Sequence, residues 1–305
     1  MLKPHIFTPE IVLDESTVIV TTNHLGASIY GPTAETFGDS GKDAQHLANA
    51  SGCRVIGLDR PHTGNNERYD KQTAHHMRTQ PEIVAAEWIK AAQPAITETG
   101  ASQVQLVGRS AGANLLLEVA LLELLPLTAI LTIDPVAILK MPVWRGKLRY
   151  AEYQIFTDRK KVDQPQNESI SISELVDCFS DPDRPLTSLR RMIARQRQDI
   201  KQYQASWATE NGFLAAALIA AKLRQTTARF AFAGYPLSGE RQQLEPKVAA
   251  LNGLRRVKPD RAPVISEFVA GTVHSSFDTP KNYIAEYYKL QLLDESYRAT
   301  LGTSL

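Results

Sequence analysis

One stretch decides how this sequence folds: QVQLVGRSAGANLLLEVALL, residues 103–122. Residues 104–107 form an apolar run typical of a buried strand, and residues 113–125 have the apolar spacing of a helix. Between them the motif Gly-x-Ser-x-Gly places Ser110 on a sharp turn, where neighbours without bulk leave a serine hydroxyl clear of both elements. So short a motif also fits a surface turn capped by serine. The flanking strand and helix favour a nucleophile.

The composition is that of an ordinary globular protein with enough apolar residues for a sizeable core. The chain has 305 residues, of which 43% are hydrophobic, and 34 Lys and Arg against 33 Asp and Glu give a net charge of +1. Such a balance predicts no nucleic-acid partner and no attraction to an anionic membrane. The two cysteines, Cys53 and Cys178, allow no disulfide framework and lack metal-ligand spacing, so they are interpreted as small buried hydrophobes.

No stretch predicts a signal peptide or a membrane span. The first residues lack a basic region followed by an apolar one. The longest apolar segment, residues 115–133, is broken by Glu118, Glu123 and Pro126. We therefore expect a cytoplasmic protein.

Short apolar runs alternate with helical patterns along most of the chain. This order predicts an α/β fold with a doubly wound, mostly parallel sheet. The expected strands are residues 18–21, 54–58, 104–107, 129–133, 229–233 and 264–269, and the expected helices are residues 44–50, 81–99, 113–124 and 280–292.

One region interrupts this alternation. Residues 140–223 contain no convincing strand and show helical patterns. The region lies between two predicted strands, where a lid could be inserted without disturbing the sheet. We expect a core domain of residues 1–139 and 224–305, with a helical cap formed by residues 140–223.

A serine alcohol needs a base to remove its proton, and His274 is the leading candidate. It lies in a turn-rich segment after the predicted strand at residues 264–269 and before the last helix. The alternative for a single histidine is a structural hydrogen bond. The other histidines of the chain lie in less suitable places.

The base in turn needs an acid that orients its imidazole. Asp134 directly follows the predicted strand at residues 129–133, and the carboxyl ends of parallel strands converge at one edge of a sheet. Glu240, after the strand at residues 229–233, is the alternative acid. Asp134 followed by proline would also suit a simple turn or helix cap.

Acyl transfer further requires backbone N–H groups that stabilise the developing oxyanion. The N–H of Ala111, at the start of the helix after the serine, is one candidate donor. The second donor is expected from residues 23–28, a loop with a glycine just after the first strong strand.

Four segments together resemble the α/β-hydrolase fold family. The Gly-x-Ser-x-Gly at residues 108–112 matches the family motif, and residues 23–28 are similar to its His-Gly-x-Gly oxyanion loop, which implies Leu25 as the second donor. Residues 55–65 resemble its Asp-x-Pro-Gly-x-Gly turn, and residues 271–277 resemble its terminal Gly-x-x-His-x-x-Phe. Family members, pancreatic-type lipases included, can carry the acid one strand early, at a place similar to that of Asp134. Cap domains lie where residues 140–223 are inserted.

These features predict a capped serine hydrolase that cleaves an ester, thioester or similar acyl bond of a small molecule through an acyl-Ser110 intermediate. No metal and no organic cofactor are implied. The same fold also supports carbon–carbon bond hydrolysis and lyase reactions, which are the first alternative. A ligand-binding homologue without catalysis is the second.

Overall fold

The computed structural model describes the sheet, the helices around it and the loops that join them. These residues are 3–24, 29, 39–61, 63, 71–136, 138–140, 142, 144–145, 210–236, 241–254 and 261–301.

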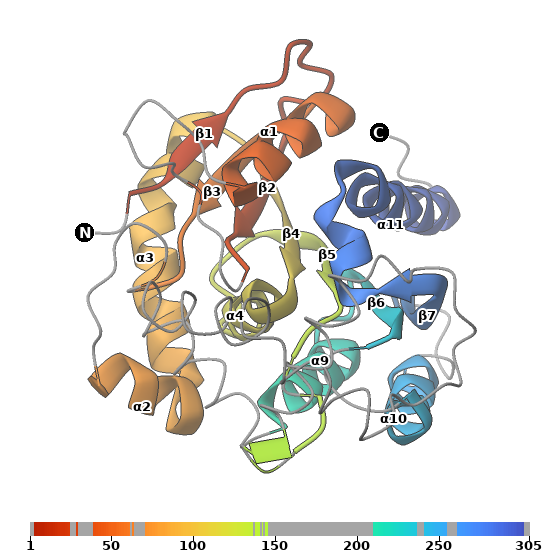
Figure 1. Cartoon of the computed structure of the whole chain (residues 1–305). Coiled ribbons are helices and arrows are strands. Elements are labelled where there is room, and N and C mark those ends of the chain that lie inside the picture. Colours follow the sequence, from red (N-terminus) through yellow and green to blue (C-terminus); the bar gives the residue numbers. More distant parts are fainter. Residues whose placement is uncertain are drawn as a thin grey trace, which may run out of the picture.

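The described strands form one seven-stranded sheet in the order β1-β3-β2-β4-β5-β6-β7 (Figure 1). Only β1 runs antiparallel, to β3, and the other paired strands are parallel. The prediction of a doubly wound, mostly parallel sheet is thus confirmed. The strands are β1 (His5–Phe7), β2 (Thr17–Thr22), β3 (Arg54–Leu58), β4 (Gln103–Arg109), β5 (Leu127–Ile133), β6 (Thr227–Tyr235) and β7 (Val264–Val273).

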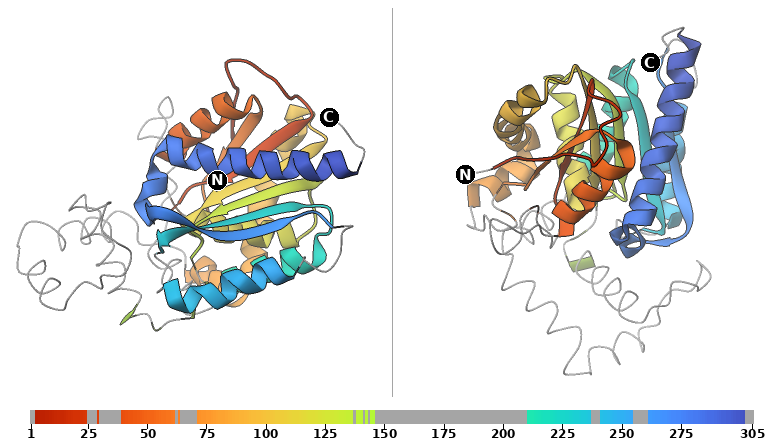
Figure 2. Two further views of the ribbon diagram at one scale, coloured as in Figure 1. Left: turned by 90° about the vertical axis from the view of Figure 1, so that its right-hand side faces the viewer. Right: turned by 90° about the horizontal axis from the view of Figure 1, so that it is seen from above.

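Helices cover both faces of the sheet, so the strands are buried on both sides (Figures 1 and 2). In β2, Val18 and Val20 pack in one apolar cluster and Ile19 packs in the other, because successive side chains of a strand point to opposite faces. One cluster includes α3 (Pro81–Thr99), α4 (Ser110–Leu121), α9 (Asn211–Lys222) and α10 (Arg241–Gly253); the other includes α1 (Asp39–Ser51) and α11 (Pro280–Thr300).

The order of the strands reverses between β2 and β4. The chain passes from β2 outward to β3, then returns across β2 through α2 (Lys71–Thr79) and α3 to reach β4 on its other side. The loops that follow β2 and β4 therefore lead away in opposite directions from neighbouring strands. A crevice outside the carboxyl ends of these two strands is the usual ligand site in such sheets.

The end of the predicted cap includes a helix that packs with the main domain. The helix α9 lies inside the expected range of residues 140–223, and its Ala215, Ala216 and Ile219 belong to the core cluster that also contains α4. Residues 146–209 lie outside the described residues. The division into a core and a cap stays a prediction.

Four elements were not expected from the sequence. The strand β1 has only three residues, and α2 and α10 are polar, with Pro246 inside α10, so none of them has a strong apolar pattern. The segment of His274 was expected as a turn-rich loop and forms η2 (His274–Asp278), a 3₁₀ helix.

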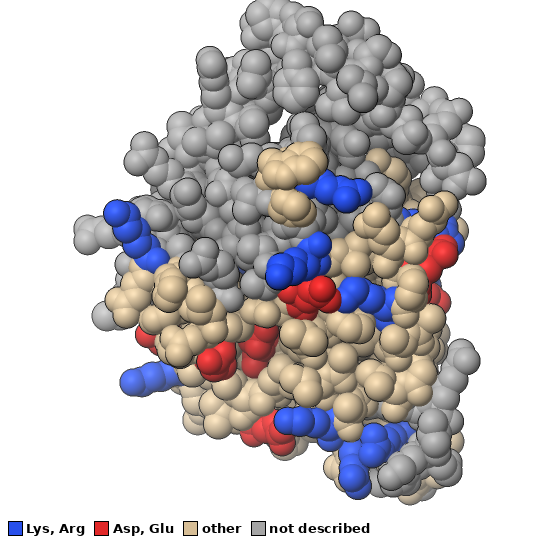
Figure 3. Space-filling model, turned by 90° about the horizontal axis from the view of Figure 1, so that it is seen from below, with Lys and Arg blue, Asp and Glu red and all other residues tan. Residues whose placement is uncertain are grey.

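No helix among the described residues is long and apolar enough to cross a membrane. On the face seen in Figure 3, basic and acidic side chains of the described residues lie close to one another among uncharged ones. This agrees with the small net charge of the chain.

Cys53 lies in the short connection between α1 and β3, where it is buried, and its thiol is free. Burial raises the pKa of this thiol to about 11, with a further contribution from Asp14. The thiol therefore stays protonated near neutral pH, as expected for a cysteine that packs as a small apolar residue. Cys178 lies outside the described residues.

One carboxylate in the helical layer destabilises the folded protein at neutral pH. Glu118 of α4 is partly buried, and burial raises its pKa to about 7, with an additional repulsion from Glu82 of α3. The folded protein keeps the proton of Glu118 between pH 4.5 and about 7, whereas the unfolded chain loses it. The contribution of Glu118 to stability therefore falls as the pH rises through this range.

We predict that Glu118→Gln stabilises the protein at pH 8 by roughly 1–3 kcal/mol, because the glutamine is never charged. The gain should be near zero at pH 4.5 and constant above about pH 7. Urea unfolding of parent and variant at several pH values measures it, with the exposed Glu87→Gln in α3 as the control. A gain that is equal at every pH would contradict the assignment.

Candidate active site

Ser110 lies at the turn where β4 passes directly into α4. Its backbone has φ 53°, in the left-handed region that residues with a side chain rarely adopt. The residue is buried, with 1% of its surface exposed, and its Oγ makes no hydrogen bond to another described residue. The strained, polar position is the kind that persists at functional sites.

Two glycines allow this turn to be so tight. A Cβ atom at Gly108 would lie 2.9 Å from the Cα of Ala113, and one at Gly112 would lie 2.8 Å from the carbonyl oxygen of Asn23. The first contact shows how closely α4 folds back on β4. The second shows that α4 starts directly against the end of β2, so the motif needs glycine at both positions for steric reasons.

His274 and Asp134 form a hydrogen-bonded pair at the same edge of the sheet. The Nδ1 of His274 lies 2.5 Å from Oδ2 of Asp134, and both residues are buried. This contact leaves Nε2 as the other nitrogen of the imidazole. Among the two candidate acids, Asp134 therefore contacts the histidine, while Glu240 lies outside the described residues.

The neighbouring strand β6 fixes the carboxylate of Asp134. The backbone N–H of Asp134 donates to the carbonyl of Ala231 (2.7 Å), and its Oδ1 accepts from the N–H of Ala233 (3.2 Å). Asp134 has φ 42°, so it shares with Ser110 a left-handed backbone. The two carboxylate oxygens thus have separate partners, one on β6 and one on His274.

Two further residues of the β4–α4 segment contact the loops of this pair, and no pattern in the sequence indicates them. Asn114, one turn after Ser110, donates to the carbonyl of Val136 (2.6 Å) and accepts from its N–H (2.9 Å), which fixes the loop after Asp134. Arg109 donates through Nη1 to the carbonyl of Phe277 in the turn of the histidine. Both contacts join residues that are far apart in the sequence, so no local pattern could indicate them.

The loop after β2 is held next to the loop after β3. Asn23 is fully buried, and its Oδ1 accepts from the N–H of Arg60 (2.7 Å) while its Nδ2 donates to Oγ1 of Thr63 (3.0 Å). Arg60 donates through Nε to the carbonyl of Asn23 (3.0 Å). Asn23 therefore has a structural role at the start of the expected oxyanion loop.

The structure describes one of the two expected oxyanion donors. Ala111 is the second residue of α4, where the backbone N–H groups have no partner within the helix. Leu25, the other expected donor, lies outside the described residues. Ser110, Ala111, Asp134 and His274 thus all lie in the described part of the chain, and the sheet brings Asp134 and His274 into contact.

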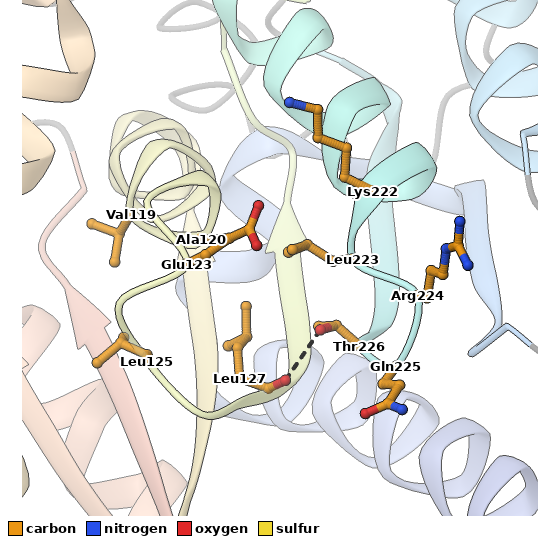
Figure 4. Close-up of a pocket in the computed structure, with 10 residues that line it drawn as sticks. All are labelled: Val119, Ala120, Glu123, Leu125, Leu127, Lys222, Leu223, Arg224, Gln225 and Thr226. Atoms are coloured by element: carbon orange, nitrogen blue, oxygen red, sulfur yellow. Dashed lines mark hydrogen bonds between the residues drawn. The ribbon is translucent and has the colours of Figure 1, made fainter.

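No group of three or more His, Cys, Asp or Glu side chains that could hold a metal ion occurs among the described residues. A pocket of about 410 Å³ lies elsewhere, between the end of α4, the start of β5 and the connection from α9 to β6 (Figure 4). Its lining includes Ala120, and Ser110 is at the other end of α4, ten residues and about 15 Å away along the helix. This pocket is not the site of Ser110.

The comparisons with known proteins identify the fold. No family model and no curated protein matches the sequence. Solved structures match over nearly the whole chain: a proline iminopeptidase from Mycobacterium smegmatis (14% identity, 97% of this chain and 95% of that one, TM-score 0.56) and a thermostable carboxyl esterase from Bacillus coagulans (11%, 96% and 93%, 0.55). A lipase-esterase related protein from Clostridium acetobutylicum is also similar (13%, 94% and 98%, 0.54). The chain has the α/β-hydrolase fold.

We predict that alanine at either motif glycine distorts the turn of Ser110. Gly108→Ala and Gly112→Ala should each destabilise the protein by about 1–3 kcal/mol, because the nearest atoms include backbone that cannot move independently. Thermal unfolding measures the effect. The matched control is Gly253→Ala at the end of α10, where a Cβ meets nothing within 4 Å. Equal melting temperatures for all three variants would contradict the close approach of α4 to β2 and β4.

Proposed function

We propose that this protein is a serine hydrolase that cleaves an ester, thioester or similar acyl bond through a covalent acyl-Ser110 intermediate. The observation that carries the proposal is the contact between His274 Nδ1 and Asp134 Oδ2, at the edge of the sheet where Ser110 occupies a strained turn. A nucleophile, an orienting acid and a base directly after β4, β5 and β7, at one edge of the same sheet, are the parts that acyl transfer requires.

In the first half of the reaction, His274 removes the proton of the Ser110 hydroxyl through Nε2, and Oγ attacks the acyl carbon. The negative charge moves to the acyl oxygen, which accepts hydrogen bonds from the N–H groups of Ala111 and, in our proposal, Leu25. Asp134 stabilises the imidazolium that forms. His274 then gives its proton to the leaving alcohol or thiol as the bond to the acyl carbon breaks.

In the second half, water replaces the leaving group. His274 accepts a proton from this water, whose oxygen attacks the acyl carbon of acyl-Ser110. Collapse of the second tetrahedral intermediate breaks the bond to Oγ and returns the proton to Ser110. All these steps use side chains and backbone groups of the protein itself.

The structural neighbours support a hydrolase but select neither the reaction nor the substrate. They include an esterase, a lipase-esterase related protein, a peptidase and a putative non-heme bromoperoxidase, so similar folds are found with more than one kind of chemistry. We propose that the substrate is a small molecule bound under the predicted cap, residues 140–223, at the carboxyl ends of the strands.

Ser110→Ala should abolish covalent labelling by a fluorophosphonate probe, because the probe reacts only with an activated hydroxyl. Gel fluorescence or intact-mass measurement detects the label. The control is Ser296→Ala, since Ser296 is an exposed hydroxyl of α11 that donates to the carbonyl of Leu292. Undiminished labelling of the Ser110 variant would rule out this nucleophile.

Asp134→Asn should lower the rate of ester hydrolysis by about 10³-fold or more, because an amide at this position no longer stabilises the imidazolium and favours the wrong tautomer. Glu240→Gln should leave the rate within about twofold, since Asp134 already occupies Nδ1 of His274. Initial rates on p-nitrophenyl butyrate compare the two variants. The reverse ranking would make Glu240 the acid of the site.

A further inference from the structure

The position of His274 depends on a short turn whose two ends are bound to different parts of the molecule. Before the histidine, Thr272 Oγ1 accepts a hydrogen bond from the N–H of Gly234 (3.1 Å), which attaches this side of the turn to the end of β6. After the histidine, the carbonyl of Phe277 accepts from the guanidinium of Arg109. The first bond joins the turn to β6, the strand whose backbone also hydrogen-bonds Asp134. The second joins it to the residue next to Ser110.

The guanidinium of Arg109 is itself fixed. Its side chain is 5% exposed, and Nη2 lies 3.9 Å from Oδ2 of Asp43 in α1. Tyr283 of α11 is buried close to this ion pair, with its hydroxyl on the side chain of Thr21. Burial raises the pKa of Tyr283 well above its usual value, so this neighbour of the ion pair adds no charge of its own.

The bond from Arg109 to Phe277 crosses 168 positions of the sequence within a buried layer. A charged donor makes a stronger and more directional hydrogen bond to a carbonyl than a neutral one. The phenyl ring of Phe277 packs in the same apolar cluster as Tyr283. Both the carbonyl and the ring of Phe277 are therefore held by contacts. The end of the turn that carries His274 therefore has little freedom to move relative to β4.

We propose that Arg109 is a positioning residue that fixes the turn of His274 relative to Ser110. Its backbone is bonded directly to that of Ser110, while its side chain reaches Phe277, three residues after the histidine. One residue thus sets the distance between the attacking oxygen and the base. Asp134 orients the imidazole ring, and Arg109 places the backbone from which that ring extends.

Arg109 acts on the geometry of the site and not on the substrate. Its side chain is almost fully buried and is directed to Asp43 of α1 and to the turn of Phe277. A displacement of about 1 Å between reacting groups is enough to slow a reaction about 10²-fold. The inference rests on the proposed function, because it requires Ser110 and His274 to react together.

The experiment uses the rate and the extent of fluorophosphonate labelling of the full chain. The test variant is Arg109→Met with Asp43→Asn, which removes both charges of the pair together, so that the loss of one does not leave the other in a partly buried place. The control is Arg298→Met with Asp294→Asn in α11, which removes another ion pair of low exposure whose Nε and Oδ2 atoms are 2.8 Å apart. Concentration series give the maximal labelling rate and the apparent affinity of the probe separately, and the end point gives the fraction of protein that reacts.

For the test variant we expect a maximal labelling rate 10- to 100-fold below that of the parent, with probe affinity within about twofold and complete labelling at the end point. The control variant should lose stability and keep the parent rate. A purely structural role of Arg109 would instead give incomplete labelling at an unchanged rate, and this result would overturn the inference.

Arg109→Lys covers the case in which the double variant does not fold. Lysine keeps the charge beside Asp43 but lacks the forked geometry that reaches two acceptors, so the labelling rate should fall about tenfold or more. A rate within about threefold of the parent in either Arg109 variant overturns the inference. Failure of the parent itself to label, or labelling of Ser110→Ala, would instead refute the proposed function.

Discussion

The architecture of the candidate site depends on one steric constraint, the close approach of α4 to the ends of β2 and β4. Gly108 and Gly112 have no room for a side chain, since a Cβ at either would contact backbone within 3 Å. This approach forces Ser110 into a left-handed backbone at the very start of a helix. It also places Arg109 and Asn114 against the two loops that carry the histidine and the acid. The turn therefore organises the whole site.

Much of the fold could be predicted from the sequence. The central strands are buried on both faces, so their sequences are nearly continuous apolar runs. The same holds for Ser110, whose motif follows from local sterics, and for Asp134 and His274, which directly follow strands in positions that a parallel sheet brings together. The contact of Asp134 with His274 could not be predicted over one with Glu240, since both acids follow strands of the same sheet. The fold itself matches solved structures at low identity.

Other features could not be predicted because they depend on contacts between distant segments. Arg109 lies at a variable position of the motif, and its partner Phe277 is 168 positions away. Asn114 has the appearance of an ordinary polar residue in an apolar helix. Its side chain nevertheless hydrogen-bonds both the carbonyl and the N–H of Val136. The helix α10 has few apolar residues and a proline, so its place against β7 follows from packing alone. Each of these is a tertiary effect with no local signal.

In the proposed reaction, Ser110 carries the acyl group between the two halves of the catalytic cycle. Rapid acid quenching during turnover of p-nitrophenyl butyrate, followed by peptide mass mapping, detects this intermediate. We predict one butyryl group on the peptide that contains Ser110, with a greater occupancy in Asp134→Asn if water attack is slowed more than acylation. Turnover with no acylated Ser110, or with the acyl group on another residue, would contradict it.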